Sequence, residues 1–150
     1  MKNEHTTMFE LVGGQWFFDA LVDRFAQRVE ADRVLRPLYP ADLEPGMRAL
    51  ALFLGQYWGG PAAYSAEKGH PRLRMRHAPF AIDARARDAW LSAMLASVDE
   101  ADAPAVARER LAEYFTMAST AMINRLQEQA SPTARATEPN TTGGSAIMDE

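Results

Sequence analysis

The chain has 150 residues, of which 47% are hydrophobic and 24% charged, and its net charge is −4. This length suits one globular domain that buries its own core without cross-links. Cysteine is absent from the sequence, which excludes disulfides, iron–sulfur clusters and any metal site built on thiolates. The negative net charge argues against non-specific binding to nucleic acid.

The two ends of the chain differ from its middle. The first twelve residues, MKNEHTTMFELV, carry charges and no apolar run of signal-peptide length, and no later segment approaches a membrane span. From about Ser131 the sequence is rich in Thr, Pro, Gly and Ser and too poor in apolar residues to order itself. We therefore expect a soluble cytoplasmic protein without membrane contact, with one domain over residues 1–130 and a disordered tail over residues 131–150.

The first half of the domain predicts helices punctuated by glycine and proline. Apolar residues recur every three or four positions, which is the pattern of an amphipathic helix, and each run ends at a glycine pair or a proline. The expected elements are, in order, a short turn over Met8–Val12, a helix over Gln15–Ala31, a turn over Asp32–Leu38 capped by Asp32, a loop over Ala41–Pro45 and a helix over Gly46–Trp58.

The second half continues in the same way, and no segment alternates as a strand would. Asp83 is a good N-cap for the helix that follows it, and Pro104 suits a first helical turn. The fold class predicted is therefore all-α. The expected elements are a polar connection over Ala62–Gly69 in which Ser65 caps a turn, a short helix over Pro71–Ala78, a helix from Asp83 to Asp99 and a final helix from Pro104 to Leu126.

The most informative stretch is Gly69–Phe80, GHPRLRMRHAPF. His77 follows Leu73 by four positions, so both lie on one face of a short helix that Pro79 must end. Four cations accompany it within nine residues, namely Lys68, Arg72, Arg74 and Arg76. An imidazole beside an apolar face and flanked by guanidinium groups could hold an iron porphyrin. A single histidine at such a position is, however, more often a structural or surface residue.

Several motifs together resemble one family. They are VGG at Val12–Gly14, LYP at Leu38–Pro40, QYWGGP at Gln56–Pro61, GHPRLRMRHAPF at Gly69–Phe80 and RDAWL at Arg87–Leu91. They look like the group II truncated haemoglobins, small haem proteins with a two-over-two helical sandwich. The resemblance covers about Met8 to Leu126 and implies a truncated globin that holds haem b and binds dioxygen and other diatomic ligands reversibly.

The resemblance also assigns roles to residues on the haem side. It implies that His77 is the proximal iron ligand, bound through its outer nitrogen while the inner N–H donates to a backbone carbonyl. Arg76 and Tyr64 would reach the haem propionates, although a solvated arginine and a loop tyrosine need no such role. His70 is expected to be structural. The haem-binding set is completed by the apolar residues Met47, Leu50, Phe53 and Leu73.

On the ligand side, the resemblance implies that Trp90 and Tyr39 donate hydrogen bonds to bound dioxygen. The alternatives are core packing for the tryptophan and a surface turn for the tyrosine. Two departures from the family fall here. Ala26 follows Phe25 where a tyrosine is common, so one donor to the ligand is missing. Gly46 leaves ligand access little hindered, unless it serves only as a loop-to-helix junction.

Three functions stay open at this stage. The first is a haem-b globin that binds dioxygen reversibly, in the sense of oxygen transport. The second is a haem enzyme that uses the same residues as a nitric oxide dioxygenase or a peroxidase, with an unidentified reductase as partner. The third is a haem-free interaction module with a basic patch that binds polyanions. The resemblance makes a homodimer or larger homo-oligomer plausible.

Overall fold

The computed structural model describes residues 6–77 and 80–124, and these ranges are entirely helical or irregular. No helix within them is both long and apolar enough to cross a membrane. The predicted domain end at residue 130 and the tail over residues 131–150 lie outside the described residues. The last described helix ends at Ala121 rather than at the predicted Leu126, because the chain turns at Met122 and is irregular at residues 123 and 124. The elements are α1 (Met8–Leu11), α2 (Gln15–Ala31), the 3-10 helix η2 (Arg36–Leu38), α3 (Glu44–Tyr57), α4 (Ala63–Lys68), α5 (Leu73–His77), α6 (Ala84–Asp99) and α7 (Ala105–Ala121).

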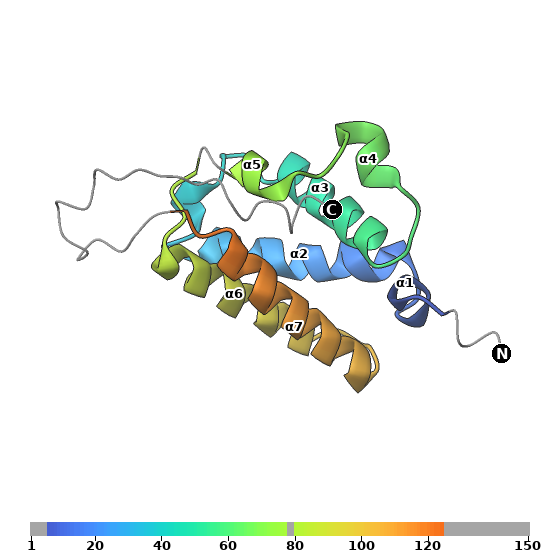
Figure 1. The fold of residues 1–150 in the computed structure, drawn as a ribbon. Helices are drawn as coiled ribbons and strands as arrows, with labels where there is room; N and C mark the ends of the chain where they lie inside the picture. The colour runs from blue at the N-terminus through green and yellow to red at the C-terminus, as the bar shows by residue number, and fades with distance from the viewer. Residues whose placement is uncertain (1–5, 78–79, 125–150) are drawn as a thin grey trace.

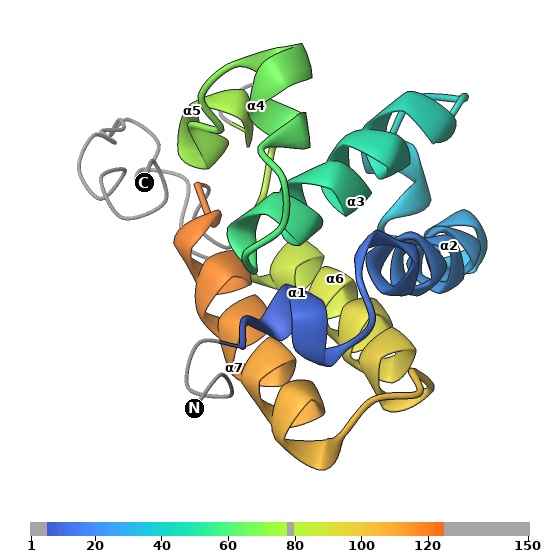
Figure 2. The ribbon, with the colours of Figure 1, turned by 90° about the vertical axis from the view of Figure 1, so that its right-hand side faces the viewer.

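Four long helices form two layers (Figure 1). Helix α2 packs on α3 in one layer, α6 packs on α7 in the other, and α2 contacts α6 between the layers. The short helices α4 and α5 lie on the other side of α3 from α2 (Figure 2). The all-α class and the two-over-two arrangement predicted from the sequence are confirmed.

Helix α2 is the centre of the core, and its bounds are those predicted. It buries one apolar stripe at helical spacing, made of Phe17, Phe18, Leu21, Val22, Phe25 and Val29. Fully burying such a side chain stabilises the fold by about 1.5–3 kcal/mol before the entropic cost of ordering is subtracted. The stripe therefore fixes the face that α2 turns toward α3 and α6.

Two aspartates begin their elements as the sequence predicts. The Asp83 carboxylate accepts a hydrogen bond from the backbone N–H of Ala86 at 2.9 Å, which caps α6. The Asp32 carboxylate accepts from the N–H groups of Val34 and Leu35 at 2.8 and 2.9 Å. It therefore caps the turn that leads into η2, where the chain approaches the site described below.

Helix α4 corrects the prediction of a polar connection over residues 62–69. The Ser65 side chain does not cap a turn. Instead the backbone N–H of Ser65 donates to the Gln56 side-chain oxygen at 2.9 Å, and the Ser65 hydroxyl accepts from the Gln56 side-chain nitrogen at 2.8 Å. Tyr64 is buried against the core. A helix of six residues is too short to show a helical repeat of apolar residues in the sequence. It is stabilised by contacts with the rest of the chain rather than by its own residues.

Two helix starts also differ from the prediction. Helix α3 begins at Glu44 rather than at Gly46, because Pro45 is tolerated in a first helical turn. Helix α5 begins at Leu73 rather than at Pro71. The reason is that Arg72 has a φ of 40°, outside the right-handed helical region. The single turn that remains is described as far as His77, and the predicted end at Ala78 lies outside the described residues.

A substitution at Gly59 tests how the N-terminal segment packs against the end of α3. Its φ is +110°, and a Cβ there would lie 2.6 Å from the Thr7 Cβ. We expect Gly59→Ala to lower the free energy of unfolding by about 1–3 kcal/mol, from backbone strain and this clash together.

The matched control is Gly46→Ala, since a Cβ at that helical position meets nothing within 4 Å. It should raise the free energy of unfolding by up to ~1 kcal/mol. Denaturant titration measures both changes. Equal stabilities for the two variants would contradict the strain assigned to Gly59.

Candidate functional site

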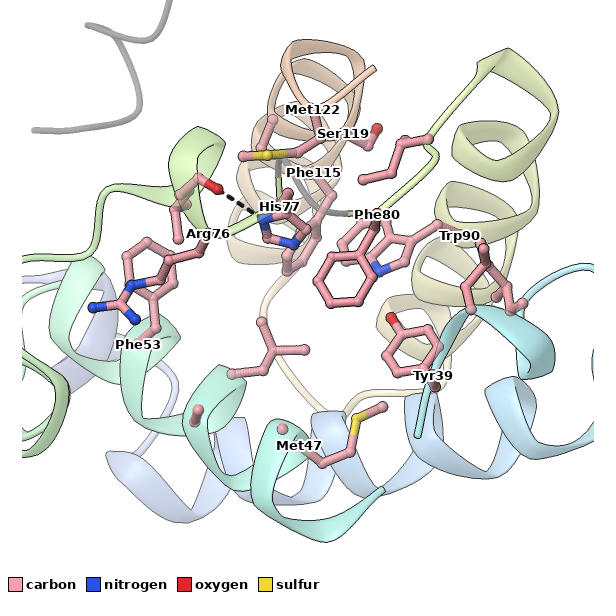
Figure 3. A pocket seen from close by; sticks show the side chains of 18 of the residues that line it. Tyr39, Met47, Phe53, Arg76, His77, Phe80, Trp90, Phe115, Ser119 and Met122 are labelled. Carbon is pink, nitrogen blue, oxygen red and sulfur yellow. Dashed lines mark hydrogen bonds between the residues drawn. The ribbon is translucent and has the colours of Figure 1, made fainter. Parts of the chain in front are cut away.

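A cavity of about 440 Å³ lies between the two layers. It is lined by α3, α5, α6, α7 and the segment around η2 (Figure 3). The lining is mostly apolar, and it includes all four predicted apolar residues, Met47, Leu50, Phe53 and Leu73. Polar groups reach it at only a few points, which is the usual character of a cofactor or small-molecule site.

His77 presents one ring nitrogen to this cavity. Its Nδ1 lies 2.8 Å from the carbonyl oxygen of Leu73, one turn earlier in α5. A carbonyl can only accept, so Nδ1 must be the donor, and the other nitrogen, Nε2, keeps its lone pair. Figure 3 shows the ring held by this bond with its second nitrogen turned toward the cavity. A half-buried imidazole oriented in this way can serve as a metal ligand.

Arg76 and Tyr64 both line the cavity, but the arginine is largely engaged with the backbone. Its Nε donates to the Pro71 carbonyl at 2.7 Å, and Nη2 donates to the carbonyls of Lys68 and His70 at 2.7 and 3.2 Å. The guanidinium carbon lies 5.8 Å from the centre of the Tyr64 ring. Arg76 therefore fastens residues 68–71 to α5, and Nη1 is the nitrogen with no bond to the described residues.

Tyr39 and Trp90 meet at the other end of the cavity. An indole can only donate, so the hydrogen bond between them runs from Trp90 to the Tyr39 hydroxyl and leaves the phenol proton free to donate. Burial raises the pKa of Tyr39 to about 12, and the bond from Trp90 partly opposes this shift. Figure 3 shows both polar atoms on the cavity side. The phenol is thus a neutral donor at physiological pH.

Phe25 and Ala26 are not among the residues that line the cavity. Phe25 is fully buried, and its ring packs edge-on against Trp90 with centroids 5.2 Å apart. Phe115 contacts the same indole at 5.8 Å. Phe25 therefore orients the tryptophan from behind. Gly46 does line the cavity, with open space where a side chain would stand.

The sequence reasoning did not assign several residues that line the cavity. They include Leu35, Leu38, Phe80, Ile82, Tyr114, Phe115, Ser119 and Met122. Those on α7 were visible as an apolar helical face, and that signal is the same for core packing and for a cavity wall. Phe80, which is 45% exposed, comes after residues 78 and 79, which lie outside the described ranges, and it carries no periodic signal.

A two-over-two helical fold with a histidine nitrogen facing an apolar cavity defines a haem-binding globin. The bacterial-like globin family model matches residues 7–124, and the chain belongs to this family. The predicted recognition of a truncated haemoglobin is thereby confirmed. Binding of dioxygen is the general function of globins, and family membership favours it over a haem-free interaction module.

The chain is similar to several known proteins over nearly the whole length of each of them. A hemoglobin of Chloroflexus aurantiacus is 56% identical, with 79% of this chain and 98% of that chain covered and a TM-score of 0.78. A thermostable hemoglobin of Thermobifida fusca is 51% identical, with 79% and 97% covered and a TM-score of 0.77. A group 2 truncated hemoglobin of Bacillus subtilis is 38% identical over 129 residues, which are 86% of this chain and 97% of that protein.

The raised pKa of Tyr39 predicts a pH dependence of stability. An exposed tyrosine ionises near pH ~10. Because the folded-state pKa is higher, the stability from the neutral phenol is present below pH ~10 and is lost as the pH rises through about 12. Tyr39→Phe should reduce this loss, measured as the free energy of unfolding by denaturant titration at each pH. An undiminished loss in the variant would contradict burial of the phenol.

Proposed function

We propose that the chain is a cytoplasmic haem-b globin that takes up and releases dioxygen, with His77 as the proximal ligand and Trp90 and Tyr39 facing the gas. The observation that carries the proposal is the bond from His77 Nδ1 to the Leu73 carbonyl, at 2.8 Å. It leaves Nε2 directed into a cavity whose far end holds two hydrogen-bond donors. Ferrous haem, when bound, supplies the iron that takes up the gas.

The residues on the proximal side orient the ligand nitrogen. The Leu73 carbonyl fixes the tautomer and the ring plane of His77, and it makes the imidazole a stronger donor to a metal. Arg76 holds the loop that precedes α5. We assign Nη1 of Arg76, with the Tyr64 ring beneath the guanidinium, to the haem propionates. Met47, Leu50, Phe53 and Leu73 supply the apolar contacts to the ring and exclude water.

The residues on the distal side stabilise a ligand that gains negative charge. The Tyr39 O–H is a neutral donor in an apolar cavity, where hydrogen bonds to developing charge are stronger than in water. The Trp90 N–H, which donates to the Tyr39 hydroxyl in this structure, is the second donor that a ligand would take over. Phe25 and Phe115 hold the indole in place. At position 26 the alanine supplies no third donor, and Gly46 leaves the α3 side open to gas.

A second candidate function is oxidative chemistry at the same site. Nitric oxide dioxygenation and peroxide reduction would use the same histidine and the same distal donors, together with a reductase that returns the iron to the ferrous state. The observation that favours peroxide chemistry is Tyr114, an oxidisable ring that lines the cavity and contacts a second, exposed tyrosine. Turnover with peroxide or with a reductase, against simple reversible oxygenation, separates the candidates. We further propose that the protein assembles as a homodimer or larger homo-oligomer.

His77→Ala tests the proposed ligand. Without the nitrogen that faces the cavity, the variant should fail to retain haem, seen as loss of the Soret band after gel filtration of protein mixed with haemin. The matched control is His70→Ala, because His70 is exposed and its backbone carbonyl is the one group that hydrogen-bonds to the described residues. Haem retention by both variants alike would overturn the assignment of His77.

Ala26→Tyr tests the missing donor. Adding a hydrogen bond to a partly charged ligand is worth about 1.5–3 kcal/mol, or one to two powers of ten. The rate of oxygen release should fall by roughly that factor, measured by stopped-flow displacement. Gln27→Tyr, at the exposed neighbouring position, is the control and should leave the rate unchanged. An unchanged or faster release from Ala26→Tyr would refute the prediction.

A further inference from the structure

A pair of tyrosines connects the cavity with the protein surface. Tyr114, on α7, is buried and lines the cavity. Its ring lies against that of Tyr57, on α3, with centroids 4.5 Å apart and planes inclined by 36°. The side chain of Tyr57 is 47% exposed. Among the described residues, this pair of rings therefore runs from the cavity lining to an exposed side chain.

Further ring contacts tie this pair to both ends of the cavity. Trp90 contacts Phe115 at 5.8 Å, and Phe115 contacts Tyr114 at 5.4 Å. From the His77 side, Tyr64 contacts Phe53 at 5.6 Å, and Phe53 contacts Tyr57 at 5.8 Å. Both lines meet at Tyr57. Since electron tunnelling falls steeply with distance, a series of short steps between rings is faster than one long step.

We propose that Tyr57 is a surface oxidation site, at which small phenols deliver electrons to the haem cavity through Tyr114 when hydrogen peroxide is the oxidant. The inference rests on the proposed haem binding and extends its second candidate function. It assigns a class of reductant and a place of reaction outside the cavity, so the phenol need not enter the space that haem would fill.

The electrons and protons balance as follows. Hydrogen peroxide takes two electrons and two protons in the cavity, where its O–O bond breaks to give two molecules of water. Each electron arrives by way of Tyr57, whose O–H bond breaks, with the electron passing to Tyr114 and the proton to solvent. A phenol then gives a hydrogen atom to the Tyr57 radical and restores it. Two phenols are converted to two phenoxyl radicals for each peroxide.

The radical is expected on the ring that can release its phenol proton to water. Burial raises the pKa of Tyr114 above its ordinary range, and its hydroxyl donates to no described residue. An oxidised Tyr114 that keeps its proton is unstable, so it takes an electron from Tyr57, whose proton can leave to water. Trp58 also contacts Tyr57, at 5.1 Å. The Trp58 N–H is buried and has no partner in the described part of the chain, and the Arg110 guanidinium lies 5.7 Å from its ring, which disfavours a cationic radical there. Trp58 also lies 5.6 Å from Tyr114 but is only half-exposed, so Tyr57 is the exposed ring among the described rings that contact Tyr114, and it can give its proton to water.

The test is to locate the radical in the haem-loaded protein. Ferric protein is mixed with one equivalent of hydrogen peroxide and a spin trap, and the adduct is mapped by mass spectrometry alongside freeze-quench electron paramagnetic resonance. We expect the adduct on Tyr57. Tyr57→Phe should lose it and slow the oxidation of an added phenol. Tyr114→Phe should lose most of the Tyr57 adduct although Tyr57 is still present, a result that a purely structural role for these rings does not give.

Trp16→Phe is the matched control, because Trp16 is 66% exposed and makes no ring contact among the described residues. It should leave the Tyr57 adduct unchanged. An adduct on Trp16 with none on Tyr57, or an undiminished Tyr57 adduct in Tyr114→Phe, would overturn the inference. These outcomes leave haem binding intact, because the Soret band is measured on the same samples. Absence of that band would instead overturn the proposed function together with the inference.

Discussion

The hydrogen bond between His77 Nδ1 and the Leu73 carbonyl is the constraint on which the site depends, because it decides which nitrogen faces the cavity. It exists only because α5 forms one helical turn between these two residues. Arg72, at a φ of 40°, prevents an earlier start, and Arg76 ties the preceding loop to the same turn. A short element with little stability of its own is therefore held by backbone contacts on its N-terminal side.

The opposite end of the cavity is built from rigid packing. Phe25 and Phe115 enclose the Trp90 indole, and the indole in turn bonds to Tyr39. Two aromatic contacts therefore fix the position of two donors. Because α2 supplies Phe25 and α7 supplies Phe115, the position of the indole depends on how the two layers pack, whereas Tyr39 comes from the segment that follows η2.

The parts of the fold that depend on residues close together in the sequence could be predicted. The bounds of α2 and the cap at Asp83 follow from periodicity and side-chain chemistry within a few residues. Helix α4 could not be predicted, because the Gln56 amide that holds it is nine positions away. The roles of Phe25 and Tyr114 were hidden for a different reason. A buried aromatic residue has the same sequence pattern whether it packs a core, supports a binding residue or lines a cavity.

The cavity also gives two tyrosines different chemistry by the same physical effect. Burial in an apolar space keeps the phenols of Tyr39 and Tyr114 neutral, because the anion would lose its hydration. Tyr39 accepts from Trp90 and can direct its proton at a ligand. Tyr114 has no such partner among the described residues, and its nearest ring is the exposed Tyr57. One neutral phenol is thus placed to bind the ligand, and the other to pass an electron from Tyr57 inward to the cavity.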